Sequence, residues 1–420
     1  MFTSCSKHET RSFKSASVYI QDSGSGFKLI RNGKPFVIKG AGGNEHLEEL
    51  KLAGANTIRV YNPDELPLIL QNAERLDLAV IADIPLPQAH DIEFYSDQKK
   101  FDSLKTEVLQ IVNRFKDHPA LLYWNLGNEL MYPTLSFTTD FSAGFNELIN
   151  EIHQLDKNHP VSTSIIGGNR RRLVSIAISS ANLDFLSFNS FGNLHELQEK
   201  IESVSFIWDG PYVISEWGIN GPWEEERTSW YAPIEQTSTK KAEHFKTRYN
   251  QYISKLDSKR CLGSLAFYWG NKQETTSTWY SIFSPDGDRT ESYYELSQIW
   301  KGNDSNYKGP RINYALLNGQ GAKNDIILNS GSEAILELEF LNSKSPDNTL
   351  IEWEVKREAW FKAYNNQPNI SSGVFNGTNS TSFVTPSIEG PYRVFIKASK
   401  NGDFATTNIP FYVLNSSDGK

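Results

Sequence analysis

Short apolar runs and longer amphipathic segments alternate along the chain from Pro35 to about Trp300. The short runs are rich in β-branched residues, which is typical of strands. The longer segments repeat their apolar residues every three or four positions, as in 101–115, and this spacing predicts helices. The predicted strands are Phe36–Lys39, Thr57–Tyr61, Ala79–Ile84, Leu121–Asn125, Val161–Ser164, Phe185–Asn189, Tyr212–Glu216 and Leu265–Trp269.

Buried strands that alternate with helices indicate a parallel sheet covered by helices. Eight such units over about 270 residues match a (β/α)8 TIM barrel in size and count. A doubly wound open sheet is the alternative, but the sequence GAGGNE at 40–45 lacks the final glycine of a dinucleotide-binding turn. The predicted fold class is therefore α/β, with a barrel over 26–301 and a disordered tether over 1–25.

After Trp300 the period of the apolar residues becomes two. Residues 302–310 are polar and contain glycine and proline, so they are predicted to be a linker. About seven short alternating runs follow, and they predict a smaller all-β immunoglobulin-like sandwich over 311–420. Its segment GPYRV at 390–394 is typical of a tyrosine corner. We expect this domain to pack against the barrel rather than to bind sugar, since fold alone does not imply function.

Composition narrows the classes of function. The 420 residues are 38% hydrophobic and 12% aromatic, enough for a large core. The formal net charge of −8 argues against nucleic acid as a partner, because phosphate binding needs a basic face. No apolar run approaches the length of a membrane span. HExxH, CxxC and Walker sequences are absent, so no metal and no other cofactor is expected.

The first residues, MFTSCS, place Cys5 after small residues. This resembles the end of a bacterial lipoprotein signal, in which Cys5 would carry the lipid. An incidental cysteine in a disordered N-terminus is the equally favoured alternative, since chain ends are disordered by default. The expected location is periplasmic, at the cell surface or secreted, with a lipid anchor left open.

Two glutamates come directly after apolar strands. Strand four and its turn read HPALLYWNLGNE and end at Glu129, and strand seven reads PYVISEWG around Glu216. A charge in such a place is costly unless it has a partner or a function. Catalytic groups of a barrel project from the carboxyl ends of its strands, so both carboxylates would face one mouth. One protonated and one ionised carboxyl group is the pair that cleaves a glycosidic bond.

These motifs resemble the acid/base and nucleophile motifs of clan A glycoside hydrolases, and are most similar to the barrel domain of glycoside hydrolase family 2. The similarity extends to NTIRVY around Arg59 and VIADIPL around Asp83. It implies that Glu129 is the general acid/base and Glu216 the nucleophile of a retaining enzyme. It also implies that Asn128 binds the sugar 2-hydroxyl and that Arg59 keeps Glu216 ionised.

The chain departs from this family at strand six. Clan A enzymes often place a tyrosine or histidine there, where it bonds to the nucleophile. Here the sequence Asn189-Ser190-Phe191 has a phenylalanine at the nearest position, and His195 follows four residues later. The supporting hydrogen bond to Glu216 is therefore unassigned.

Aromatic and amide side chains cluster after predicted strands seven and eight. Pyranose rings stack on aromatic side chains, although about half of these tryptophans are expected to be loop core. The loop after strand eight is similar to that of barrel-plus-immunoglobulin-like proteins associated with β-glucans, which favours a β-1,3-glucan. The predicted substrate-binding residues are Arg59, Asn128, Asn189, Trp217, Trp269, Asn271, Gln273 and Trp279.

The sequence thus predicts a retaining β-glycoside hydrolase that acts on an oligo- or polysaccharide by double displacement. A transglycosylase, in which a sugar replaces water in the second step, is one alternative that the sequence does not separate. A catalytically silent carbohydrate-binding barrel is the other. The presence of Glu129 and Glu216 argues against it, while Phe191 leaves it open.

Overall fold

The computed structural model describes residues 17–134, 139–180, 182–303, 306–341, 348–360 and 367–415. Cys5 lies outside these ranges, so its lipidation stays a prediction. The chain folds into two compact units. One holds the residues up to Trp217 together with Gln251–Phe267, and the other holds Gly218–Asn250 together with the residues from Tyr268 on.

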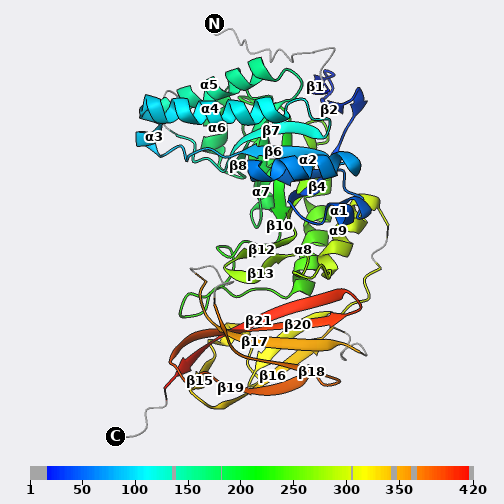
Figure 1. Ribbon diagram of the computed structural model, residues 1–420, viewed down its shortest axis with the longest axis vertical. Coiled ribbons are helices and arrows are strands. Elements are labelled where there is room, and N and C mark those ends of the chain that lie inside the picture. Colours follow the sequence, from blue (N-terminus) through cyan, green and yellow to red (C-terminus); the bar gives the residue numbers. More distant parts are fainter. Residues whose placement is uncertain are drawn as a thin grey trace. The chain divides into compact units, whose positions relative to one another are not determined.

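A closed barrel of eight strands forms the first unit (Figure 1). Going round the barrel, each strand lies beside the strand that precedes it in the chain, and the last, β11, lies beside the first, β4. This closure confirms the predicted (β/α)8 barrel. The barrel strands are β4 (Ile38–Gly43), β5 (Thr57–Val60), β6 (Ala79–Ile84), β7 (Leu121–Asn128), β8 (Val161–Ile166), β9 (Phe185–Asn189), β10 (Tyr212–Gly218) and β11 (Cys261–Trp269).

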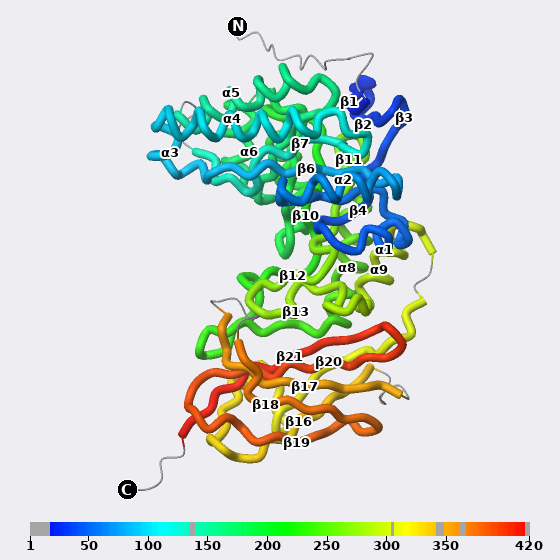
Figure 2. Tube along the Cα trace, viewed as in Figure 1, coloured from blue at the N-terminus to red at the C-terminus, as the bar shows by residue number. Residues whose placement is uncertain are grey.

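Helices alternate with these strands along the chain, as the trace in Figure 2 shows. In α4 (Gln98–Phe115) the buried side chains follow the helical repeat, and the Asp97 carboxylate accepts hydrogen bonds from first-turn N–H groups. None of the helices in the described ranges is long and apolar enough to cross a membrane. The other helices are α1 (Leu47–Leu52), α2 (Leu66–Arg75), α3 (Ile92–Ser96), α5 (Asp140–Leu155), α6 (Arg170–Ser179), α7 (Leu194–Glu202), α8 (Ser238–Gln251) and α9 (Glu291–Lys301), with short 3-10 turns η1 (Pro63–Glu65), η2 (Ile253–Lys255) and η3 (Ala322–Asn324).

Apolar side chains close the amino end of the barrel. A small antiparallel sheet of β1 (Val18–Asp22), β2 (Phe27–Arg31) and β3 (Lys34–Pro35) packs its apolar side chains with Ile38 at the start of β4. The prediction of a tether up to residue 25 is therefore wrong over β1. Alternate residues of β1 are buried there, which makes the segment a strand.

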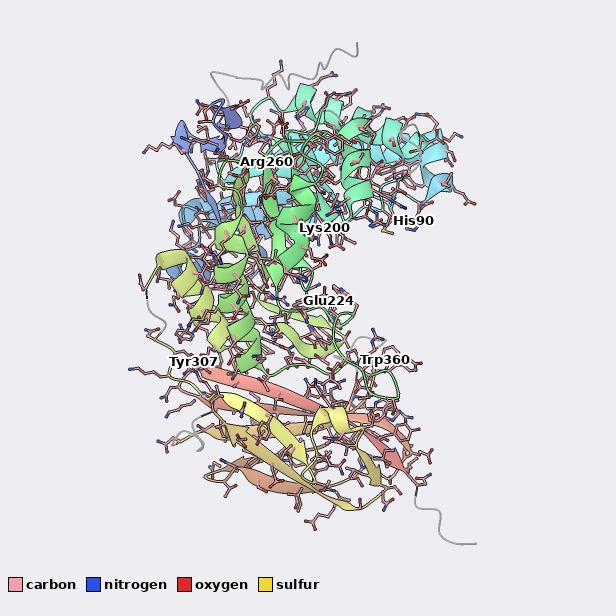
Figure 3. All side chains as sticks on the ribbon, turned by 180° about the vertical axis from the view of Figure 1, so that it is seen from behind. His90, Lys200, Glu224, Arg260, Tyr307 and Trp360 are labelled. Carbon is pink, nitrogen blue, oxygen red and sulfur yellow. The ribbon has the colours of Figure 1, made fainter. Side chains whose placement is uncertain are left out.

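Two sheets in the second unit agree with the predicted sandwich. Every second side chain of β16 (Glu333–Phe340) is buried, as the period of two predicts. Tyr392 Oη donates to the Ile388 carbonyl at 2.7 Å, which is a tyrosine corner. Tyr307, in the predicted linker, is buried and labelled in Figure 3. The remaining strands are β14 (Ile312–Leu317) and β19 (Ser380–Val384) beside β16; β15 (Ile327–Asn329), β21 (Asp403–Leu414), β20 (Gly390–Lys400), β17 (Leu350–Arg357) and β18 (Asn369–Asn376) in the second sheet; and the hairpin β12 (Asn271–Glu274) and β13 (Thr276–Ser281).

A buried ionic cluster in the second unit consists of Glu235, Lys241, Glu358, Arg393 and Asn408. Lys241 Nζ lies 2.5 Å from Glu235 Oε1, and Arg393 Nε lies 2.9 Å from Glu358 Oε2. Asn408 joins the two ion pairs, because its Nδ2 donates to Glu235 at 2.6 Å and its Oδ1 accepts from Arg393 at 2.6 Å. The cluster therefore ties strands β20 and β21 to the segment that follows β10.

Candidate active site

The carboxyl end of β7 leaves regular strand geometry and presents Asn128 and Glu129. The pairing of β7 with β8 shifts between Asn125 and Asn128, and Glu129 has a φ of 52°. A left-handed backbone is costly for a residue other than glycine, and such strain gathers at functional sites. The Glu129 N–H donates to the Ser164 carbonyl at 2.8 Å, which helps to hold this conformation.

The end of β10 is irregular in a related way. Its pairing with β9 shifts between Ile214 and Glu216. In a regular strand Ser215 and Glu216 would point to opposite faces. Here both reach the same group of side chains: Ser215 Oγ donates to Asn189 Oδ1 at 2.7 Å, and Glu216 Oε1 accepts from Arg59 Nη1 at 2.9 Å. Glu216 is only 5% exposed.

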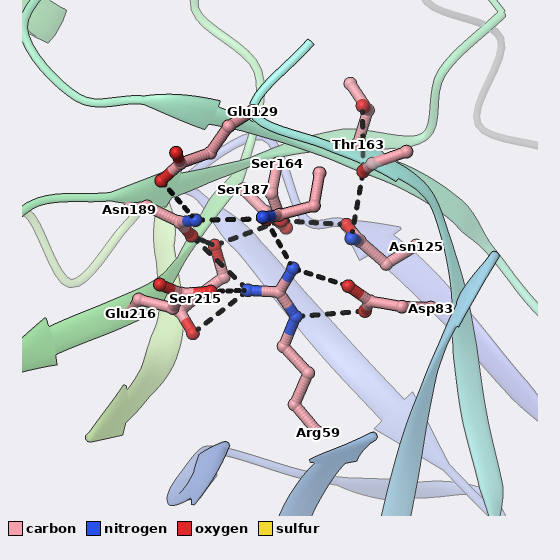
Figure 4. Close-up of polar contacts among 12 residues, drawn as sticks. Arg59, Asp83, Asn125, Glu129, Thr163, Ser164, Ser187, Asn189, Ser215 and Glu216 are labelled. Carbon is pink, nitrogen blue, oxygen red and sulfur yellow. Dashed lines mark hydrogen bonds and ion pairs between the residues drawn. The ribbon is translucent and has the colours of Figure 1, made fainter. Parts of the chain in front are cut away.

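Arg59 of β5 lies at the centre of the site and is fully buried (Figure 4). Its Nε and Nη2 donate to the two oxygens of Asp83 at 2.9 and 2.6 Å. Nη1 reaches Glu216, and Nη2 also donates to Asn128 Oδ1 at 2.8 Å. The two-pronged bond to Asp83 fixes the plane of the guanidinium, so its other N–H groups have fixed directions.

Burial and charge pairing oppose each other in this group. Burial lowers the pKa of Arg59, but the charges of Asp83, Tyr61 and Glu216 outweigh this effect and raise that pKa to well above its ordinary value. Burial raises the pKa of Asp83, and the attraction of Arg59 offsets only part of that rise. The guanidinium consequently remains charged and supplies a cation beside Glu216.

Asn189, at the end of β9, links Glu129 to Arg59, which in turn pairs with Glu216 (Figure 4). Its Oδ1 accepts from Ser215 and, at 3.3 Å, from Arg59 Nη1. Its Nδ2 donates to Glu129 Oε1 at 2.9 Å and to Asn128 Oδ1 at 3.0 Å. The structure thus brings together five of the predicted site residues: Arg59, Asn128, Glu129, Asn189 and Glu216.

A chain of hydrogen bonds joins six side chains inside the barrel. Ser164 Oγ lies 3.0 Å from Asn125 Oδ1 and 3.2 Å from Ser215 Oγ. Each member comes from a different barrel strand, so the chain of bonds joins six of the eight strands. In order, it consists of Asp83, Arg59, Asn189, Ser215, Ser164 and Asn125.

An aromatic group borders the guanidinium. Tyr61 lies with its ring 4.7 Å from the Arg59 guanidinium carbon and edge-on to Phe267. Phe191 is buried and packs against the same Phe267 ring, with centroids 5.5 Å apart. Phe191 therefore fills space beside the site, and its phenyl ring carries no N–H or O–H that could donate to Glu216. Tyr61 is not among the predicted site residues, although it follows Arg59 by two positions at the end of a predicted apolar strand.

The predicted tryptophans do not form a stacking surface for sugar. Trp217, Trp269 and Trp279 are 1%, 0% and 1% exposed. A pyranose cannot stack on a ring that solvent does not reach, so their burial makes them packing residues, which corrects the prediction. Asn271 and Gln273 lie on β12 in the second unit, and their contact with sugar stays a prediction.

Comparison with known proteins identifies the family. The model of the glycosyl hydrolases family 2 TIM barrel domain matches residues 50–260. A β-glucuronidase from Felis catus is 23% identical over an alignment of 216 residues, and the match covers 46% of this chain and 32% of that protein. The chain therefore spans about a third of the length of the curated relatives that it matches.

Solved structures show the same fold at low identity. A calcium-binding mutant of Bacteroides uniformis β-glucuronidase 2 matches with a TM-score of 0.52 and 13% identity, over 95% of this chain and 48% of that chain. A β-galacturonidase from Eisenbergiella tayi matches with a TM-score of 0.52 and 16% identity, over 69% and 55%. The range matched by the family model contains Arg59, Glu129 and Glu216. Through its TIM barrel domain, this chain belongs to the glycosyl hydrolases of family 2.

Proposed function

We propose that this protein hydrolyses β-glycosides with retention of configuration, through a covalent glycosyl intermediate on Glu216. This proposal rests on a difference between the two carboxylates: within the described ranges, one forms an ion pair with a cation and the other does not. Glu216 lies 2.9 Å from Arg59, whereas Glu129 has no cation within ion-pair distance among the residues that the structure describes. A carboxylate beside a buried cation stays ionised and can attack the anomeric carbon. Glu129 is free to carry the proton that the leaving oxygen needs.

In the first step Glu129 gives its proton to the glycosidic oxygen while Glu216 forms a bond to the anomeric carbon. In the second step Glu129 takes a proton from water, which attacks that carbon and releases Glu216. Asn128 supports this assignment: its Oδ1 is occupied by Arg59 and Asn189, and its Nδ2 has no acceptor among the described residues, which leaves a donor for the sugar 2-hydroxyl. A sugar in place of water would give transglycosylation, which product analysis at high acceptor concentration would reveal.

For the sugar, a β-glucuronide is the first substrate to test. The name of the Felis catus relative supports it. The expectation of a β-1,3-glucan came from the loop after strand eight, whose tryptophans Trp269 and Trp279 are buried. A panel of aryl β-glucuronide, β-glucoside and β-mannoside with β-1,3-linked gluco-oligosaccharides would decide between these substrates. Turnover of the gluco-oligosaccharides alone would restore the original expectation.

Substitution of each glutamate tests the mechanism. Glu129→Gln should still turn over aryl glycosides whose leaving group needs no proton, because the acid only assists departure. Glu216→Gln should lose turnover of every substrate, because no covalent intermediate can form. Glu107→Gln, on the exposed face of α4, is the matched control. Proton NMR of fresh product that showed the inverted anomer first would contradict the proposal.

A further inference from the structure

Among the described residues, Asn189 is the one side-chain hydrogen-bond donor to the Glu129 carboxylate. We propose that Asn189 is a positioning residue for the acid/base: it fixes the Glu129 carboxylate and favours its ionised form, and Ser215 in turn fixes the orientation of Asn189. This inference rests on the proposed function, because it takes Glu129 to be the proton carrier. It assigns to strand six a support for the acid/base, whereas the family resemblance implies a support for the nucleophile.

The orientation of the Asn189 amide follows from Arg59. A guanidinium has only donors, so the atom that faces Nη1 at 3.3 Å must be the amide oxygen of Asn189. The Ser215 hydroxyl donates to the same oxygen at 2.7 Å. With the oxygen held on that side, the Asn189 NH2 group faces Glu129. Turning the amide over would break both of these bonds and set donor against donor.

The orientation of a second amide, that of Asn128, agrees with this assignment of the Asn189 oxygen and NH2 group. Asn128 Oδ1 accepts from Arg59 Nη2 at 2.8 Å, so this atom is also fixed as an oxygen. It lies 3.0 Å from Asn189 Nδ2, which therefore donates to Asn128 as well as to Glu129. Arg59 thus sets the direction of two amides, and one of them delivers a hydrogen bond to the acid/base.

A donor aimed at a carboxylate favours its ionised form. Glu129 becomes ionised when its proton moves to the leaving oxygen, and it must stay in place to take a proton from water in the next step. The Asn189 bond is therefore strongest in the state between the two steps. Without this bond the proton would be held more tightly by Glu129, and the carboxyl group could turn away from its working position.

Asn189→Ala tests this role through the pH profile of kcat/KM. The basic limb, which reports loss of the acid's proton, should move to higher pH by about one unit, the size of one hydrogen bond to a charged group. Asn189→Asp should move it further, because a second carboxylate replaces the donor. With a poor leaving group kcat should fall about 10²-fold. Asn193→Ala is the matched control: Asn193 also follows β9, but its Nδ2 donates to the Gly167 backbone carbonyl at 2.8 Å.

Ser215→Ala keeps Asn189 and removes one of its two anchors, so the basic limb should move in the same direction by less. Ser215→Thr retains the hydroxyl and should restore the native limb. Basic limbs that stay in place in both Asn189→Ala and Ser215→Ala would overturn the proposal and leave Asn189 a packing residue.

Ionisation of Glu129 can also be followed without turnover, by NMR titration of carboxyl-labelled glutamate with the Glu129 signal assigned from Glu129→Gln. If the native protein turned over no substrate, the proposed function would fail, and this titration would still report on Asn189. A Glu129 titration that Asn189→Ala left unchanged would contradict the inference even in an active enzyme.

Discussion

Arg59 is fully buried and forms ion pairs with two carboxylates from different strands. Asp83 holds one edge of its guanidinium, and Glu216 receives the other. Without the arginine, both carboxylates would lose the buried cation that they share, and burial favours the protonated form of such groups. A protonated Glu216 could not attack a sugar, so the charge of Arg59 bears directly on the proposed nucleophile.

Arg59→Met should therefore move the acidic limb of the kcat/KM profile to higher pH and lower its maximum by at least ~10²-fold, the scale of one charged active-site hydrogen bond. Arg59→Lys keeps the charge but cannot donate to Asp83, Glu216 and Asn128 together. Its activity should therefore lie between that of the native protein and that of Arg59→Met. Phe191→Tyr in the Arg59→Met background should recover part of the loss if its hydroxyl reaches Glu216. Near-native activity with an unshifted acidic limb would make Arg59 purely structural.

A charge directly after an apolar run marked Glu129 and Glu216 in the sequence, and the structure places them beside Asn189 and Arg59, respectively. The sequence could not predict Ser215, because alternation along a regular strand turns this side chain away from Glu216 and only the shifted pairing of β10 brings it in. The presence of a tryptophan in the sequence could not separate a core residue from a residue that stacks on sugar, because the same ring suits both roles. Trp269, which is fully buried, is an example.

At the scale of elements, the barrel closes where β11 meets β4. Gly263 has a φ of 135°, and a Cβ atom there would lie 2.2 Å from the Ile38 carbonyl oxygen. Only glycine permits this approach, because the obstacle is backbone and cannot turn aside. The apolar pattern predicted that these strands exist. The shifts in the pairing of β7 with β8 and of β10 with β9 could not be predicted, because they do not appear as a period of apolar residues in the sequence.

Gly263→Ala should lower the free energy of unfolding by about 3 kcal/mol or more, because it adds a backbone clash to the strain of a positive φ. Gly319→Ala is the control: Gly319 has a φ of 73° and open space around it, so it pays only the backbone strain of about 1–2 kcal/mol. Urea denaturation of both variants measures the difference. Equal losses of stability would mean that β4 and β11 separate readily.

For the molecule as a whole, the buried ionic cluster makes stability depend on pH. Burial raises the pKa of Glu235, but the Lys241 ammonium, the Thr276 hydroxyl and the charge of Arg393 together lower it more, so this pKa lies below its ordinary value of 4.5. A carboxyl group with a lowered pKa contributes stability above pH 4.5 and loses that contribution as pH falls through its folded-state pKa.

Glu235→Gln should therefore lower the Tm at pH 7, where it leaves Lys241 buried without its partner at a cost of about 3–5 kcal/mol. The difference from the native protein should shrink below pH 4.5, because the native carboxylate then takes up its proton as well. Glu226→Gln breaks the exposed ion pair with Lys323 and should change the Tm little. Thermal unfolding followed at both pH values checks this, and a difference that did not depend on pH would contradict it.

The hydrogen-bonded chain of six side chains inside the barrel has one proton too few for its contacts. Ser164 Oγ lies 3.0 Å from Asn125 Oδ1 and 3.2 Å from Ser215 Oγ, yet a hydroxyl has a single proton to give. The Ser215 proton is already given to Asn189. The Ser164 proton can therefore sit in either of two places, and the chain of bonds has two states that differ by the rotation of one hydroxyl. In both states Ser215 still donates to Asn189. The two positions of the Ser164 proton therefore leave the Asn189 amide, which faces Glu129, unchanged.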